Sequence, residues 1–256
     1  MAYQFFVPTR VLFGAGQLNH LHEQDLPGKK AMVVISNGKS TRDNGYLART
    51  EEELHQAGVE TEVFDGIMPN PTVANSVAGA NAAHEFKADF LVALGGGSVM
   101  DCSKAIALLA TNEGDLWDYV AVGSGKGQPI QKRPLPIIAI TTTAGTGSET
   151  DGCGVITKEE TNEKAFIMHP SLFPVLAIVD SELMLSVPPR FTAFQGFDTL
   201  FHSVEGFIAA SANLASDMNA REAIRNIAEY LPRAVKDGTD LEARTRVASP
   251  TPCREP

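Results

Sequence analysis

The sequence predicts an α/β domain with a parallel sheet over residues 1–187, followed by an all-helical domain over residues 188–256. Up to residue 140, short apolar runs alternate with longer segments of helical composition, which is typical of parallel strands joined by helices. Two turns rich in glycine or hydroxyl residues directly follow such runs. After Pro188-Pro189 every periodic segment is helical, so we place the domain boundary there.

Strands and helices are expected to alternate through the first 110 residues. The strands are predicted at residues 11–13, 31–35, 59–64 and 90–94, and the helices at residues 46–57, 73–86 and 102–110. Gly58 suits the position after the first helix, because glycine readily adopts a left-handed conformation there. Thr72 is placed to cap the second helix. The apolar run from Phe90 to Leu94 indicates a strand buried on both faces.

The turn Gly95-Gly96-Gly97-Ser98 comes directly after this buried strand. A strand, a glycine turn and a helix N-terminus together form an anion-binding site, because free amides and the helix dipole point to the same place. Ser98 is expected to be the N-cap, with Asp101 three residues later as in a capping box. The spacing is neither that of a Walker A loop nor that of the usual dinucleotide fingerprint. A tight turn without a ligand therefore stays open as the alternative.

A second polar turn follows the strand predicted at residues 136–140. Hydroxyl side chains and glycines predominate in residues 141–149. An isolated segment of this kind is usually a solvated surface loop. Ligands of open α/β sheets bind at the carboxyl ends of the strands, so two such turns after neighbouring strands indicate a binding site. Residues 155–157 and 177–180 are expected to complete the strands.

The helical part contains a regular apolar stripe near its start. In the helix that begins near Thr192, aromatic and aliphatic residues recur at spacings of three and four, which predicts a face directed at the core. The members of this stripe are Phe194, Phe197, Phe201, Val204 and Ile208. Further helices are expected at residues 217–236 and 241–248. The three prolines of residues 249–256 cannot continue a helix.

Asp198 and His202 lie one helical turn apart beside this stripe. A carboxylate and an imidazole in this arrangement can bind the same divalent ion. The alternatives are a surface ion pair and a hydrogen-bonded histidine next to the core, and both are common at this spacing. Two ligands do not hold a metal ion unaided.

Composition excludes several functional classes. The net charge of −10 argues against nucleic acid as a partner. Three widely spaced cysteines do not make a disulfide framework, so we expect a cytoplasmic protein. No apolar run approaches the ~20 residues that span a bilayer, and the first eight residues lack the pattern of a signal peptide. We therefore expect no membrane partner.

Five motifs together resemble one known family. Along the chain they are Phe13-Gly14-Ala15-Gly16, Pro69-Asn70-Pro71-Thr72, Gly95-Gly96-Gly97-Ser98-Val99-Met100-Asp101, Thr141-Thr142-Thr143-Ala144-Gly145-Thr146-Gly147-Ser148-Glu149 and Gly196-Phe197-Asp198-Thr199-Leu200-Phe201-His202-Ser203-Val204-Glu205. In this order they resemble the iron-containing (group III) alcohol dehydrogenases, over residues 1 to about 248. The resemblance implies an NAD(P)-binding α/β domain and a helical domain, with NADP or NAD and a divalent metal (iron, possibly zinc) in the cleft between them.

The resemblance also implies roles for individual residues. Gly96, Gly97 and Ser98 would hold the pyrophosphate, and Asp198 and His202 would be two metal ligands. The remaining residues expected at the cofactor are Ser36, Asn70, Asp101, Thr142, Thr143, Thr146, Asp151 and Lys164. Ser36 falls where NAD-binding folds place an acidic residue against the adenosine ribose. Because Ser36 carries no charge and Lys39 is nearby, we predict a preference for NADP(H).

The implied function is metal- and NAD(P)-dependent interconversion of a small alcohol and its aldehyde, with no catalytic residue separate from the metal site. An intact member is expected to be a homo-oligomer. The family has two further histidine ligands on later helices, whereas no histidine follows His202 here. We therefore interpret the chain as a truncated member with impaired activity, whose apolar helix faces lack their packing partners. The alternatives are an inactive nucleotide-binding remnant and, less favoured by these motifs, a zinc-dependent polyol dehydrogenase or a sugar-phosphate cyclase.

Overall fold

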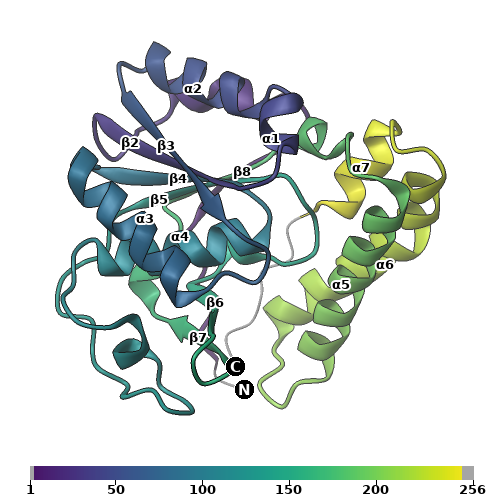
Figure 1. The fold of residues 1–256 in the computed structure, drawn as a ribbon. Coiled ribbons are helices and arrows are strands. Elements are labelled where there is room, and N and C mark those ends of the chain that lie inside the picture. Colours follow the sequence, from purple (N-terminus) through teal and green to yellow (C-terminus); the bar gives the residue numbers. More distant parts are fainter. Residues whose placement is uncertain (1–2, 250–256) are drawn as a thin grey trace.

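A six-stranded parallel sheet forms the centre of the computed structural model, which describes residues 3–249 (Figure 1). Its strand order is β1-β8-β5-β4-β2-β3, and every neighbouring pair is parallel. The strands are β1 (Arg10–Phe13), β2 (Lys30–Ser36), β3 (Glu60–Ile67), β4 (Phe90–Gly95), β5 (Ile137–Thr141) and β8 (Leu176–Val179). The predicted α/β class with a parallel sheet is confirmed, and β4 lies near the middle of the sheet.

Helices cover both faces of this sheet, which explains the unbroken apolar run of β4. Phe90, Val92 and Leu94 contribute to a core under helices η1 and α2, while Leu91 and Ala93 contribute to the core under α3 and α4. Figure 1 shows these two helical layers on opposite sides of the strands. The helices are η1 (Gln17–Glu23), α1 (Ser40–Asp43), α2 (Tyr46–Gln56), α3 (Val73–Phe86) and α4 (Gly97–Leu109).

A small antiparallel hairpin lies outside the main sheet. It consists of β6 (Cys153–Lys158) and β7 (Glu163–Met168). Residues 155–157 thus form a strand as predicted, and this strand lies in the hairpin and not in the parallel sheet. Instead β6 packs against α4, where a Cβ on Gly154 would lie 2.8 Å from the carbonyl oxygen of Asp101. Short 3₁₀ segments complete this part of the chain: η2 (Leu116–Tyr119), η3 (Ser148–Thr150), η4 (Pro170–Leu172) and η5 (Ser181–Met184).

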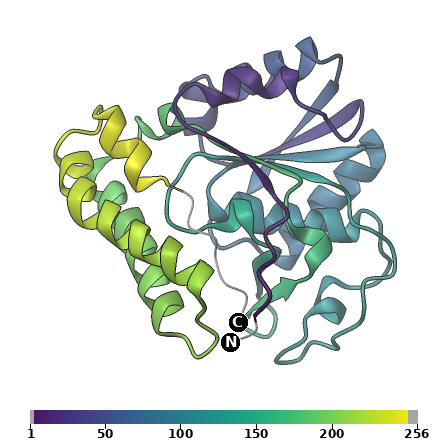
Figure 2. The same cartoon turned by 180° about the vertical axis from the view of Figure 1, so that it is seen from behind.

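Three helices follow, α5 (Pro189–Ile208), α6 (Leu214–Lys236) and α7 (Leu241–Val247), and they lie along one side of the α/β part (Figure 2). Helices α5 and α6 approach closely, since any Cβ on Gly196 would overlap the side chain of Leu231. The buried guanidinium of Arg244 joins α7 to the start of α5. It donates to Thr192 Oγ1 at 2.6 Å and to the carbonyl of Val187 at 2.8 Å.

The apolar stripe of α5 faces away from the core, contrary to the sequence-based prediction. Phe194 is 54% exposed, Phe201 61% and Ile208 74%. The opposite face of the helix, which carries small residues such as Gly196 and Ser203, is buried instead. The stripe therefore has no packing partner among the described residues, as expected for this helix. Ile227 and Leu231 of α6, in contrast, are buried against neighbouring elements. No helix within residues 3–249 combines the length and the apolar character needed to cross a membrane.

A histidine–glutamate pair makes the stability of this fold depend on pH. Glu53 of α2 is buried, and its Oε2 accepts hydrogen bonds from the backbone N–H of His22 at 3.2 Å and from the ring Nδ1 at 2.6 Å. The hydrogen bond to Glu53 raises the pKa of His22 above its ordinary value. Protonated His22 therefore stabilises the fold fully below about pH 6.5, and this stabilisation is lost as pH rises through the raised pKa.

We expect the difference in melting temperature between the wild type and His22→Gln to be largest near pH ~5.5 and to shrink by pH ~8, where the imidazole is neutral in both folded and unfolded chains. His84→Gln, on the exposed side of α3, is the matched control and should show no such trend. Thermal unfolding monitored by circular dichroism checks this. A difference that is constant across this pH range would contradict the assigned role of the pair.

Candidate cofactor and metal site

The glycine turn and the threonine-rich loop meet because they follow adjacent strands. Gly95 at the end of β4 pairs with Thr141 at the end of β5. Directly beyond this pair, the backbone N–H of Thr142 donates to the carbonyl of Gly95 at 3.0 Å. The expected juxtaposition of the two loops at the carboxyl ends of the strands is confirmed.

Helix α4 begins two residues earlier than the cap pattern suggested. Gly96 is its N-cap, and no side chain caps the helix, so the prediction of a capping box between Ser98 and Asp101 is wrong. The Ser98 hydroxyl lies in the first turn and accepts a hydrogen bond from the backbone N–H of Asn70 at 3.4 Å. A helix start without a side-chain cap leaves its first amides available to an anion.

The glycines of this turn make room for the neighbouring loop. A Cβ on Gly96 would lie 2.9 Å from Thr143 Oγ1, and a Cβ on Gly97 would lie 2.8 Å from Thr146 Cγ2. Both distances are shorter than normal packing permits. The glycines therefore have a structural reason to be present besides the close approach of a ligand.

A cavity of about 690 Å³ opens at this point, between the carboxyl ends of the strands and helix α5. Nine of the residues that were predicted to bind cofactor or metal line it: Asn70, Gly97, Ser98, Asp101, Thr146, Asp151, Lys164, Asp198 and His202. Four other predicted residues are not part of its lining: Ser36, Gly96, Thr142 and Thr143. Gly96 lies close to Thr143, next to the lining residue Gly97, and Ser36 lies at the carboxyl end of β2.

Asn70 and Lys164 form a bridge across one side of the cavity. Lys164 of β7 donates from Nζ to Asn70 Oδ1 at 2.9 Å. Asn70 has a left-handed backbone with φ of 54°, a conformation that asparagine adopts more readily than most residues. The backbone N–H of Asn70 in turn donates to Ser98 Oγ. Lys164 is thus an exposed residue whose ammonium is hydrogen-bonded to Asn70 beside the glycine turn.

A buried lysine below the cavity was not found from the sequence. Lys104 of α4 is fully buried, and its ammonium donates to Asp151 Oδ1 at 2.5 Å and to the carbonyl of Cys153 at 2.6 Å. It also contacts the carbonyl and the hydroxyl of Ser148, at 2.8 and 2.9 Å. The only sequence signal was a lysine in an otherwise apolar helix segment, three residues after an aspartate.

Two carboxyl groups beside Lys104 have altered acidity. Burial raises the pKa of Asp101, whose Oδ1 accepts a hydrogen bond from Ser148 Oγ at 2.7 Å. Burial also raises the pKa of Glu149 to about 7. The buried ammonium of Lys104 thus lies among several carboxyl groups, of which Asp101 and Asp151 line the cavity.

Asp198 and His202 lie on α5 and face the same cavity. His202 Nδ1 is 3.0 Å from the carbonyl oxygen of Gly145, so the ring N–H donates to that carbonyl and leaves the lone pair of Nε2 available. This arrangement is common for histidines that bind metals. Gly145 permits the contact, since it has φ of 108° and a Cβ there would lie 2.7 Å from the carbonyl oxygen of Gln195.

These two side chains fit two positions of a metal coordination sphere. His202 Nε2 is 4.0 Å from Asp198 Oδ1, and both side chains are about half exposed. Within residues 3–249, no group of three or more histidine, cysteine or acidic side chains is placed to hold a metal ion. The donor chemistry therefore suits a divalent ion, while the number of donors is below that of a typical catalytic site.

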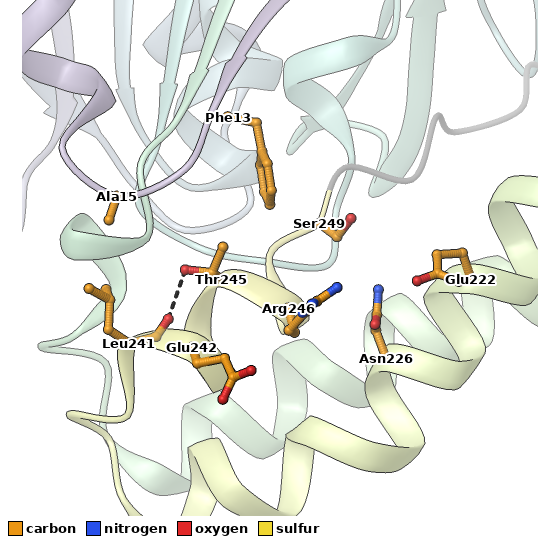
Figure 3. A pocket seen from close by; sticks show the side chains of 9 residues that line it. All are labelled: Phe13, Ala15, Glu222, Asn226, Leu241, Glu242, Thr245, Arg246 and Ser249. Atoms are coloured by element: carbon orange, nitrogen blue, oxygen red, sulfur yellow. Dashed lines mark hydrogen bonds between the residues drawn. The ribbon is translucent and has the colours of Figure 1, made fainter.

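A second cavity, of about 540 Å³, lies elsewhere, between α6, α7 and the loop after β1 (Figure 3). Its lining residues are Phe13, Ala15, Glu222, Asn226, Leu241, Glu242, Thr245, Arg246 and Ser249. None of the predicted cofactor or metal residues is among them. The two loops at the carboxyl ends of β4 and β5 thus belong to the larger cavity alone.

Comparison with known protein families gives two adjacent matches. The family described as iron-containing alcohol dehydrogenase matches residues 8–181. The family described as Fe-containing alcohol dehydrogenase, C-terminal, matches residues 192–250. Together the two matches include both loops of the cavity and helix α5 from residue 192 onward.

Individual relatives agree with these matches. Alcohol dehydrogenase 4 of Schizosaccharomyces pombe is 37% identical over 95% of the chain and 57% of its own length. The 1,3-propanediol dehydrogenase of Klebsiella pneumoniae is 38% identical over 97% of the chain and 64% of its own length. The NAD-dependent methanol dehydrogenase of Bacillus methanolicus is 35% identical over 95% of the chain.

A solved structure extends the similarity to three dimensions. An archaeal halo-thermophilic alcohol dehydrogenase from a Red Sea brine pool superposes with a TM-score of 0.93 at 36% identity, over 98% of this chain and 64% of that one. The chain thus spans between 57% and 64% of the length of these relatives.

Proposed function

Because the chain belongs to the iron-containing alcohol dehydrogenase family, we propose that it binds a nicotinamide dinucleotide and takes part in the metal-assisted interconversion of small alcohols and aldehydes. The main support is the cavity at the carboxyl ends of β4 and β5. It combines a helix N-terminus that no side chain caps with two potential metal ligands on one wall. An anion site and a divalent-ion site in one cavity are what this reaction requires.

Different residues of this chain would bind different parts of the cofactor. The first amides of α4 would receive the pyrophosphate, as helix N-termini do for phosphate groups in general. Lys164 and Asn70, already joined by a hydrogen bond, would fix the part of the cofactor that lies nearest β7. Once bound, the nicotinamide would supply or accept a hydride.

Asp198 and His202 would hold the metal, with the Gly145 carbonyl fixing the orientation of the imidazole. A divalent ion there would supply Lewis-acid polarisation of the substrate oxygen. The names of the relatives refer to different alcohols, among them 1,3-propanediol, methanol and butanol. We therefore propose a small alcohol or aldehyde as the substrate class.

A nucleotide-binding protein without catalysis is the second candidate. The observation that favours it is the presence of only two suitably placed ligands within residues 3–249. Titration of the purified chain with NADPH and NADH, followed by cofactor fluorescence, tests the part common to both candidates. If neither NADPH nor NADH binds, both candidate functions are wrong. Cofactor binding together with metal-dependent turnover would exclude the second candidate.

We further propose that NADP(H) binds more tightly than NAD(H). Ser36 ends β2 next to β4, and Lys39 follows immediately before α1, so a 2′-phosphate would meet a hydroxyl and a cation. Ser36→Asp should shift the ratio of the two dissociation constants toward NADH by about tenfold or more, because the new carboxylate repels the phosphate. Ser36→Ala, which adds no charge, is the control.

Titration calorimetry with both cofactors checks this prediction. Equal or tighter binding of NADH by the wild type would contradict it. So would a Ser36→Asp variant whose cofactor preference is the same as that of Ser36→Ala.

A further inference from the structure

We propose that the second cavity is a binding site for a small organic monocarboxylate with an aromatic or aliphatic body. This cavity lies between α6, α7 and the loop after β1, and it shares no lining residue with the cavity at the carboxyl ends of β4 and β5. The inference therefore goes beyond the proposed function and does not depend on it. A volume of about 540 Å³ is within the range of small-molecule sites.

A buried amide without a partner extends into this cavity. Asn226 of α6 is 4% exposed, and its side chain has no hydrogen-bond partner among residues 3–249. The amide of Asn112, which is also buried, bonds instead to the carbonyl of Leu108 and to the backbone N–H of Lys132. Figure 3 shows the Asn226 amide extending from α6 toward the space beside Ser249. Because an unpaired buried amide is destabilising, a ligand that bonds to it would explain its presence.

Arg246 of α7 supplies a cation at the same place. Its guanidinium lies 5.5 Å from the centroid of the Tyr230 ring, and it contacts no carboxylate within 4 Å in the part of the chain that the structure describes. In Figure 3 this guanidinium extends into the cavity toward Asn226. A guanidinium and a primary amide both donate hydrogen bonds, and a carboxylate can accept from both at once. The two side chains therefore favour a carboxylate ligand.

The acidic residues of the cavity limit the charge of that ligand. Glu222 and Glu242 line the cavity, and each already contacts an arginine at 2.8 Å, Arg225 and Arg233 respectively. Arg233 is shared with Asp240, so the neutralisation is incomplete. A phosphate group, with about two negative charges, would be repelled more strongly than a carboxylate with one. The charge distribution therefore favours a monoanion.

Phe13 and Leu241 supply an apolar surface beside these donors. Phe13 is 39% exposed and Leu241 37%, and both side chains line the cavity. Figure 3 shows the ring of Phe13 extending from the end of β1 toward α7. A ligand with an aromatic or aliphatic body would remove this apolar surface from water. Apolar walls with a few polar groups that fix the orientation are typical of small-molecule sites.

The test uses 3-phenylpropionate, which has one carboxylate and one ring, in a calorimetric titration of the full chain. We expect a dissociation constant below about 1 mM, as is reasonable for a ligand of this size. The uncharged 3-phenylpropionamide should bind about tenfold more weakly or worse, because it lacks the charge that pairs with the guanidinium. If the acid does not bind, or binds no better than the amide, the inference is wrong.

Arg246→Met assigns the binding to this cavity and should weaken the affinity for 3-phenylpropionate by about tenfold or more. Arg221→Met is the matched control, because that guanidinium also lies 5.5 Å from an aromatic centroid, that of Phe207, and does not line the cavity. It should change the affinity by less than about threefold. Lys164→Met tests binding in the cofactor cavity. A loss of affinity in Lys164→Met with none in Arg246→Met would overturn the inference.

Asn226→Leu provides a second readout that does not depend on measuring affinity. Without ligand, this variant should melt about 2 °C or more above the wild type, because an apolar group replaces an unpaired buried amide. It should also bind 3-phenylpropionate more weakly, and the acid should raise its melting temperature less than that of the wild type. A lower melting temperature, or unchanged binding of the acid, would show that the amide serves the fold alone and would overturn the inference.

Discussion

Gly97→Val is expected to abolish dinucleotide binding by the purified chain, with a loss of more than about 100-fold in affinity, equivalent to about 3 kcal/mol. Gly97 is the first residue of α4 and lines the cavity. A branched side chain at this position would occupy the space in front of the helix N-terminus, where the pyrophosphate is proposed to lie. Calorimetric titration with NADPH and NADH measures the effect directly.

The contact between Gly97 and Thr146 requires a control for this experiment. A side chain at Gly97 would also push against Thr146 Cγ2, so a loss of binding could arise from displacement of the threonine-rich loop. Thr146→Ser removes that methyl group and keeps the hydroxyl. Gly97→Ala/Thr146→Ser should therefore fold without this overlap and still bind poorly. If the double variant binds as well as Thr146→Ser, the glycine serves the packing of the loop and the proposed anion site is wrong.

The elements that the sequence predicted best are those with strong local signals. Helix α3 has the predicted bounds of Val73 and Phe86, because Thr72 caps it and forms a capping box with Asn75. Part of the candidate site could be predicted from the topology of the sheet. Once β4 and β5 are neighbours, the loops after them must meet, and residues as far apart as Asn70 and Asp151 come to line one cavity.

What the sequence did not predict depends on distant contacts. Lys104 stands in an apolar helix, and its role arises only from partners more than 40 positions later, such as Asp151. Ser98 has the right chemistry for a cap, but the helix already starts at Gly97, with Gly96 as an N-cap that has no side chain. The hairpin partner β7 has no strong strand pattern of its own, and pairing with β6 defines it.

The apolar stripe on α5 shows what hydrophobic periodicity can and cannot predict. Spacings of three and four correctly place Phe194, Phe197 and Phe201 on one face of a helix. Periodicity does not tell which neighbour covers that face. In the structure α6 packs on the opposite, small-residue face around Gly196, and the aromatic rings remain exposed. An apolar surface of this kind favours association between molecules.

Weak metal binding and low turnover are the expected results for the 256-residue chain. Catalytic divalent sites usually have three or more protein ligands, whereas Asp198 and His202 supply one carboxylate and one imidazole. His169 does not add a third, because it caps η4 and is not among the residues that line the cavity. Cofactor binding, which depends on the glycine turn, should therefore survive better than metal binding.

The measurement is the iron and zinc content of anaerobically purified protein, together with aldehyde-dependent oxidation of NADPH and NADH in the presence of ferrous ion. His202→Ala should remove the residual metal affinity, since the imidazole is one of only two donors, while leaving the affinity for NADPH within about threefold. His169→Ala, with its partner in η4, is the matched control and should change neither. Near-stoichiometric metal with robust turnover would show that further ligands complete the site, and that two donors are an incomplete description of it.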